Sequence, residues 1–207
     1  MKKGITKILS ACVFAFVVFL AAGTQSKAAV NMGVKQTGAG SSYVDLAWNA
    51  QLGAGHYHTQ FSQDGKNWID MEYSSSPSDS VYNLTQGASY YARVVAYNGS
   101  HYSGTHVMVG VSETAIVSTK PTEVTGLTQT AAGVNSVSMS WNASAGAASY
   151  VIYGYINYNW TQIGTSATNS ATITGVAATT STKFSVAAVK NVTGGTVTGD
   201  QCSGVEM

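Results

Sequence analysis

A strand-like segment ending in Trp-Asn-Ala occurs twice in the 207-residue chain, as YVDLAWNA at residues 43–50 and as SVSMSWNA at residues 136–143. The two tryptophans, Trp48 and Trp141, are 93 residues apart, and three further features follow each copy in the same order. These features are a tyrosine nine residues on, a turn with a second tryptophan, and a later alternating segment: Tyr57, 64–68 and 90–96 in the first half, and Tyr150, 158–160 and 182–188 in the second. Features that recur in register predict an internal duplication.

Each repeated segment has the pattern of a half-buried β-strand. Successive side chains of a strand point to opposite faces, so Val44, Leu46 and Trp48 share one face. Clusters of Gly, Ser, Asn and Thr separate such runs, and sustained helical periodicity is missing after the first 28 residues. About seven short strands per repeat predict an antiparallel sandwich. Asp64-Gly65 predicts a two-residue hairpin turn, because glycine adopts positive φ angles at little cost.

We therefore expect an all-β chain of two tandem antiparallel, immunoglobulin-like sandwiches. The expected organisation is a leader at residues 1–28, a first domain at 29–119 and a second domain at 120–207, with Pro121 opening the second domain. A connection this short is expected to limit bending between the domains.

Each half resembles a fibronectin type III domain, and the two halves together cover nearly all of the chain after the leader. The residues that carry the resemblance are Trp48, Tyr57, Leu84, Gly87, Tyr90, Val94 and Ala96 in the first half, and Trp141, Tyr150, Val176, Val186 and Ala188 in the second. Thr182 departs from the pattern, because that family has a tyrosine there whose hydroxyl bonds back to the preceding loop. The resemblance therefore implies a looser corner in the second domain.

The first 28 residues have the layout of a secretory signal peptide. Lys2, Lys3 and Lys7 precede an apolar run at residues 8–22, and small residues surround the expected cleavage after Ala28. The alternative is a transmembrane anchor, but the run is shorter than the roughly 18–20 apolar residues that a membrane-spanning helix needs. We expect a secreted protein whose mature chain does not insert into a membrane.

Removal of the leader changes both the charge and the cysteine content. Four of the ten basic residues leave with it and none of the nine acidic ones, so the mature chain has a net charge of −3. Without a basic surface, nucleic acid is not an expected partner. One cysteine remains, Cys202, for which we favour a buried thiol over an intermolecular disulfide.

Motifs for nucleophilic, phosphate-binding or calcium-binding chemistry do not occur in the sequence. Asp70 and Glu72 are expected on one strand face, but two carboxylates beside a sheet need a cleft to act as an acid–base pair. We therefore expect no enzymatic activity and no cofactor.

All four histidines, His56, His58, His101 and His106, lie in the first half. His56 and His58 are expected on one face of a strand, and His101 and His106 flank a turn that the family places near the start of that strand. Imidazole is a common ligand of zinc, copper and nickel, which makes the four a weak candidate metal site. The alternative is a set of surface histidines without a metal, which we favour because no carboxylate or thiolate completes the ligand set.

Outward-facing aromatic residues are the other candidate site. If Tyr90, Val94 and Ala96 face the core, the alternate residues of that strand face outward. The candidate binding residues are Tyr91, Arg93, Tyr97, Tyr102 and Trp68, with Tyr153, Tyr155 and Tyr158 as a second group. Exposed tyrosine and tryptophan are favoured at recognition surfaces. The alternative is that these residues simply suit β-strands.

Two hypotheses for the function follow. In the first, the protein is a non-enzymatic extracellular module that binds a protein or a glycan through aromatic strand faces and loops. In the second, it is a structural spacer or assembly subunit without a ligand of its own. A contiguous exposed aromatic face favours the first hypothesis, and open sheet edges favour assembly.

Overall fold

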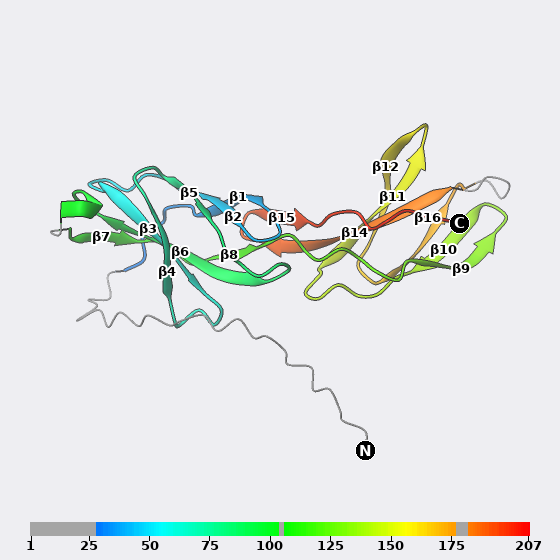
Figure 1. Ribbon diagram of the computed structural model, residues 1–207, viewed down its shortest axis with the longest axis horizontal. Helices are drawn as coiled ribbons and strands as arrows, with labels where there is room; N and C mark the ends of the chain where they lie inside the picture. Colours follow the sequence, from blue (N-terminus) through cyan, green and yellow to red (C-terminus); the bar gives the residue numbers. More distant parts are fainter. Residues whose placement is uncertain (1–27, 104–105, 177–181) are drawn as a thin grey trace, which may run out of the picture.

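The computed structural model describes residues 28–103, 106–176 and 182–207, which form two β-sandwiches joined end to end (Figure 1). The expectation of an all-β chain is confirmed, because every regular element of these residues is a strand except one short 3-10 segment, η1 (His101–Ser103). Residues 1–27 of the expected signal peptide lie outside the described part of the chain.

The first sandwich packs a three-stranded sheet against a larger sheet, both antiparallel. The smaller sheet has the order β1–β2–β5, and the larger has the order β4–β3–β6–β7, with β8 paired to the other half of β6. Their bounds are β1 (Lys35–Ala39), β2 (Val44–Ala47), β3 (His56–Ser62), β4 (Ile69–Ser74), β5 (Ser78–Val81), β6 (Ser89–Tyr97), β7 (Met108–Val111) and β8 (Ala115–Ser118).

The second sandwich repeats this arrangement. Its smaller sheet has the order β13–β10–β9, and its larger sheet has the order β12–β11–β14–β15, with β16 paired to the other end of β14. The bounds are β9 (Thr128–Gly133), β10 (Ser136–Ser140), β11 (Ser149–Ile156), β12 (Asn159–Ser166), β13 (Ser170–Thr174), β14 (Lys183–Val192), β15 (Gly195–Thr198) and β16 (Val205–Glu206).

The two cores are built around the same aromatic pair. Trp48 and Tyr57 meet edge to face with ring centroids 5.4 Å apart, and Trp141 and Tyr150 do so at 5.3 Å, both with an interplanar angle of 67°. All four side chains are buried. Each tyrosine hydroxyl also accepts a hydrogen bond from a backbone N–H six residues before it, at 3.1 Å for Tyr57 and 3.0 Å for Tyr150. The duplication inferred from the sequence therefore extends to the packing of the cores.

In the first domain, a tyrosine hydrogen-bonds to the backbone of the loop before β6. The hydroxyl of Tyr90 accepts a hydrogen bond from the backbone N–H of Thr85 at 3.0 Å, which is the corner contact that the family resemblance implies. In the second domain, Thr182 exchanges backbone hydrogen bonds with Met207 at 3.1 and 3.3 Å. The preceding residues 177–181 lie outside the described ranges, so the expected loosening of that corner remains a prediction.

The hairpin turns differ from the sequence expectation. The prediction of a two-residue turn at Asp64-Gly65 is wrong, because β3 ends at Ser62 and β4 begins at Ile69. The carboxylate of Asp64 accepts hydrogen bonds from the N–H groups of Lys66 and Asn67, both at 2.8 Å, and so stabilises a longer loop.

A two-residue turn occurs instead between β11 and β12. Its residues, Asn157 and Tyr158, have φ angles of 49° and 65°. Both φ angles are positive, as a type I′ hairpin turn requires.

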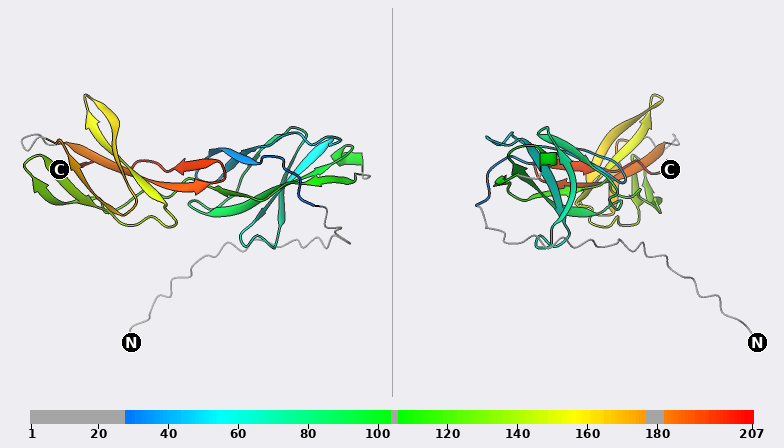
Figure 2. Two further views of the ribbon diagram at one scale, coloured as in Figure 1. Left: turned by 180° about the vertical axis from the view of Figure 1, so that it is seen from behind. Right: turned by 60° about the vertical axis from the view of Figure 1, so that its left-hand side comes forward.

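The hairpin of β14 and β15 docks on the first domain, as Figures 1 and 2 show. The N–H of Thr193 donates to the carbonyl of Ile116 at 2.8 Å, and the hydroxyl of Thr193 accepts from the N–H of Ile116 at 2.7 Å. Lys120 forms an ion pair with Asp200 at 2.7 Å. These contacts join the domains in addition to the short connection.

Two further features of the described residues bear on the expectations. Cys202 is a buried free thiol in the second core, as expected, and its Sγ accepts a hydrogen bond from the N–H of Val186 at 3.2 Å. Across residues 28–103, 106–176 and 182–207, we find no helix with the length and hydropathy required to span a membrane.

Candidate functional site on the outer face of the first domain

The candidate site lies on the face of the larger sheet of the first domain that points away from the core, here called the outer face. In β3 and β6, Tyr57 and Phe61 point into the core opposite Ala96 and Ala92. The alternate cross-strand pairs therefore lie on the outer face: His56 with Tyr97, His58 with Val95, Gln60 with Arg93 and Ser62 with Tyr91.

Two residues of β4, Asp70 and Tyr73, also lie on the outer face, because this strand contains a bulge between them. Asp70 pairs with Gln60 and Glu72 pairs with Thr59, with Met71 as the additional residue between them. Because Gln60 and Thr59 point to opposite faces of β3, the expectation that Asp70 and Glu72 share a face is wrong. The same register places Tyr73 opposite His58 on the outer face. The sequence analysis missed Tyr73, because its position depends on the bulge.

One half of the outer face is a row of polar side chains beside aromatic rings. The guanidinium carbon of Arg93 lies 4.1 Å from the ring centroid of Trp68, and its Nε donates to the Gln60 side-chain oxygen at 2.7 Å. Gln60 in turn donates to the carboxylate of Asp70 at 2.6 Å. Burial lowers the pKa of Arg93, and the nearby Asp70 opposes this effect. Tyr91 continues the row along β6 with 38% of its surface exposed.

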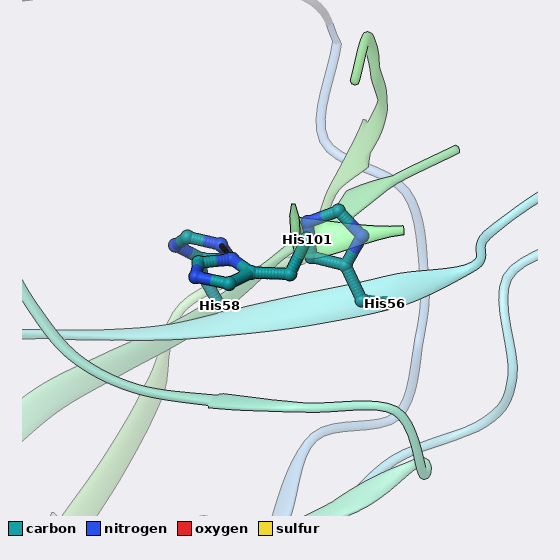
Figure 3. Close-up of side chains that lie close together, drawn as sticks. All are labelled: His56, His58 and His101. Atoms are coloured by element: carbon teal, nitrogen blue, oxygen red, sulfur yellow. Dashed lines mark hydrogen bonds between the residues drawn. The ribbon is translucent and has the colours of Figure 1, made fainter. Parts of the chain in front are cut away.

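The other half of the outer face holds the four histidines. Figure 3 shows His56 and His58 on β3 with His101 of η1 beside them. The ring of His106 lies 5.1 Å from that of His56. The segment after β6 thus folds back over the start of β3, which the family resemblance implied. The four imidazoles lie together.

Tyrosines surround these histidines. Tyr97 stacks on His56 with centroids 5.3 Å apart, and Tyr73 stacks on His101 at 4.2 Å. The Tyr73 hydroxyl makes a hydrogen bond with that of Tyr102, which raises the pKa of Tyr73. Tyr102 itself is 80% exposed. Burial raises the pKa of Tyr97.

The second group of aromatic residues lies in the other domain. Tyr155 pairs with Trp160 across β11 and β12, with ring centroids 5.3 Å apart, and both are exposed. Tyr153 is half-buried on the same strand face, and Tyr158 at the turn is 89% exposed. Edge strands β4 and β12 project to opposite sides of the long axis (Figures 1 and 2). The two aromatic groups therefore belong to different domains.

No protein-family model matches the chain. Chitinase A1 of Niallia circulans is 33% identical over 162 residues, which cover 74% of this chain and 22% of that enzyme. The chain thus spans about a fifth of the length of this relative.

Solved structures with a similar arrangement include tandem domains from chicken. The FN1–FN3 domains of chicken CNTN1 match 86% of this chain and 67% of their own with 15% identity and a TM-score of 0.48. A two-domain fibronectin type III segment of chicken tenascin matches 84% of this chain and 97% of its own with 16% identity and a TM-score of 0.41.

The strand order within each unit defines an all-β protein of two antiparallel sandwiches, each with a three-stranded sheet facing a larger one. Together with the paired core aromatics of both units and the tyrosine corner of the first, this gives the chain two tandem sandwiches with a fibronectin type III-like fold.

Proposed function

We propose that the protein is an exported, non-enzymatic binding module that recognises an extracellular glycan through the outer face of its first domain. The observation that carries this proposal is the continuity of that face. Side-chain contacts run from Trp68 through Arg93, Gln60 and Asp70, and Asp70 lies 4.0 Å from His58 at the edge of the histidine cluster. Tyr73 and Tyr102 complete the face at its far end.

The chemistry of this face suits a sugar. Aromatic rings offer flat apolar surfaces to the C–H groups of a pyranose, and tyrosine and tryptophan are enriched where one side of a contact is wet. Amide, carboxylate and guanidinium groups beside the rings supply donors and acceptors for hydroxyl groups. Two pockets of the described residues, one beside Lys120 and one beside Asn135, lie away from this face. We expect the contact to be with the surface of an extended chain.

The remaining elements of the proposal come from the sequence and from one comparison. The expected signal peptide at residues 1–28 supports export of the chain. The relative named as a chitinase makes chitin the first polysaccharide to test. Its enzymatic activity is not part of the proposal.

The test is binding of residues 29–207 to insoluble chitin, to a glycan array and to a panel of extracellular proteins. Saturable binding to a glycan, weakened more than about tenfold by combined Tyr91→Ala and Tyr102→Ala substitutions, is the expected result. Tyr158→Ala is the matched control, because this exposed tyrosine lies in the other domain. Binding to a protein alone, or equal loss in the control, contradicts the proposal.

A rigid spacer is the second candidate function. The observation that favours it is the docking of the β14–β15 hairpin on the first domain, with hydrogen bonds between Ile116 and Thr193 and the ion pair of Lys120 with Asp200. A spacer needs a fixed angle between its domains and no ligand. A folded monomer that binds none of the probes and keeps one interdomain angle in solution supports this function instead.

A further inference from the structure

The four histidines form a compact group that belongs to different parts of the first domain. His56 and His58 stand two residues apart on the outer side of β3, while His101 and His106 come from the segment that follows β6. One ring nitrogen from each of His56, His58 and His101 lies within 4.8 Å of the others. Together with His106, these three are all the histidines of the chain. Figure 3 shows His56, His58 and His101, and the ring of the fourth, His106, lies 5.1 Å from that of His56, so the fold gathers every imidazole of the protein at one place.

His56 is the buried member, with 2% of its surface exposed. Its Nδ1 lies 3.0 Å from the backbone carbonyl of Gly99, which can only accept a hydrogen bond. Nδ1 therefore carries the proton of the neutral ring, and Nε2 presents a lone pair. Within the described residues this Nε2 has no hydrogen-bond partner. A buried acceptor without a partner is costly, and a metal ion would satisfy it.

A close approach of two backbone segments positions this ring. A Cβ atom at Gly55 would lie 2.1 Å from the carbonyl oxygen of Gly99, so only glycine fits at this position. The N–H of Gly55 donates to the carbonyl of Tyr97 at 2.7 Å, which holds the start of β3 against the end of β6. This contact brings the Gly99 carbonyl to the Nδ1 of His56. A carbonyl bonded to the far nitrogen is the usual support of a metal-binding histidine.

His58 and His101 face each other through ring nitrogens. Nε2 of His58 and Nδ1 of His101 are 3.2 Å apart. Two nitrogens bound to one tetrahedral zinc ion at about 2.0–2.1 Å are separated by roughly 3.3–3.4 Å, so the observed spacing suits two ligands of one ion. On its other side, Nδ1 of His58 lies 4.0 Å from the carboxylate of Asp70. Burial lowers the pKa of His58, and the neighbouring histidines add to this, against the effect of Asp70.

His106 completes the group. Its ring lies 5.1 Å from that of His56 and 6.3 Å from those of His58 and His101. Its Nδ1 is buried and, among the described residues, has no hydrogen-bond partner. The cluster thus contains two buried imidazole nitrogens without partners, in addition to the close pair of His58 and His101.

From this geometry we propose that His56, His58 and His101 bind a first-row transition-metal ion such as Zn²⁺, Cu²⁺ or Ni²⁺, with His106 beside the site. Imidazole is a preferred ligand of these ions, whereas Mg²⁺ and Ca²⁺ prefer oxygen. The bound ion connects β3 to the segment after β6, across about 43 residues of sequence. The histidines adjoin the proposed glycan-binding face, but metal binding is measured without a glycan, so failure of one proposal is distinguishable from failure of the other.

The first test is isothermal titration of residues 29–207, prepared without a polyhistidine tag and stripped of metal with a chelator. We expect one equivalent of Zn²⁺, Cu²⁺ or Ni²⁺ to bind, and Mg²⁺ not to bind. His58→Ala and His101→Ala should each weaken binding more than about tenfold. Gln129→Ala is the control, because this exposed strand residue of β9 lies in the second domain, away from the histidines. Equal binding by His58→Ala and the unaltered protein would overturn the proposal.

A second measurement avoids variants that fold poorly. Nitrogen-15 NMR of the histidine rings in the unaltered protein reports which nitrogen binds the metal. On addition of Zn²⁺ we expect Nε2 of His56 to shift while its Nδ1–H signal remains, and the nitrogens of His58 and His101 to shift with it. If the ring signals do not change with up to several equivalents of Zn²⁺, the cluster is not a metal site.

Discussion

The ammonium group of Lys190, in β14 of the second domain, donates a hydrogen bond to the backbone carbonyl of Gly87 in the first domain. Lys190 is 4% exposed, and burial lowers its pKa. The ion pairs of the described residues do not include Lys190, and separation of the domains would rehydrate its charge, so the burial of this cation opposes the docking. The interdomain contact therefore includes both favourable hydrogen bonds and an unfavourable desolvation.

The Lys190→Met substitution is expected to weaken the docking of the two domains. A hydrogen bond from a charged donor contributes about 1.5–3 kcal/mol, and relief of the desolvation opposes its loss, so we expect a net weakening of about 1 kcal/mol. The measurement is residual dipolar couplings, which should report a broader range of interdomain angles. Lys183→Met is the control, because Lys183 is exposed at the other end of the same strand. Unchanged couplings in Lys190→Met would show that the other contacts suffice.

Replacement of the corner tyrosine tests the family resemblance in the first domain. Tyr90→Phe removes the hydroxyl that accepts the Thr85 N–H and keeps the buried ring. We expect the first domain to lose about 1 kcal/mol of unfolding free energy, the usual contribution of one hydrogen bond. Urea unfolding followed by tryptophan fluorescence measures this loss. Tyr82→Phe, at an exposed position, should leave the midpoint unchanged.

The carboxylate of Glu113 should make stability depend on acid pH. It accepts hydrogen bonds from the N–H groups of Met32 at 2.9 Å and Val34 at 3.1 Å. Burial by itself raises the pKa of Glu113, but these backbone amides hold it below its usual value. The stabilisation is therefore present above pH 4.5, the ordinary value, and is lost as the pH falls through the lower pKa of the folded state.

The matching variant is Glu113→Gln. At pH 7 it should unfold with about 1 kcal/mol less free energy than the unaltered protein, because neutral acceptors make weaker hydrogen bonds. The difference should shrink in thermal unfolding series as the pH falls below about 4.5. A difference that stays constant from pH 7 to pH 2 would assign the loss to packing rather than to charge.

Ionisation of Asp79 should lower the stability of the fold, whereas ionisation of Glu113 should raise it. Burial raises the pKa of this β5 carboxylate, although it accepts a hydrogen bond from the Thr59 hydroxyl at 2.9 Å. The folded state then binds the proton more tightly than the unfolded state, so the ionised form destabilises the fold above the folded-state pKa. Asp79→Asn keeps an acceptor for Thr59 without the charge. It should raise the thermal midpoint at pH 7, with the gain disappearing near pH 3.8. A gain that persists at that pH would contradict a role for charge.

The two sandwiches were predictable because the same pattern of strands and core residues occurs in both halves of the sequence. Trp48 and Trp141 occupy equivalent positions, and so do Tyr57 and Tyr150, which reflects the demands of the same core. The proximity of the histidines could also be predicted from the sequence, because the family topology brings the turn after β6 to the start of β3. Period-two patterns carry this information because one side of each strand must be buried.

Other features depend on interactions that the pattern does not contain. The bulge at Met71 places Tyr73 on the outer face, and a bulge changes the alternation without a clear mark in the sequence. Asp64 was expected in a tight turn, but its side chain hydrogen-bonds to two backbone amides and holds a longer loop. Asn157 and Tyr158 form the tight turn although neither is glycine.

The docked hairpin of the second domain also has a consequence for the order of assembly. The strand that it contacts, β8, ends at Ser118, so every strand of the first domain precedes residues 183–198 in the chain. Because domains generally fold as units, the first domain can form before the second and present Ile116 and the Gly87 carbonyl to the hairpin. The second domain then completes its last hairpin against a surface that already exists, which reduces the opportunity for its strands to pair with another chain.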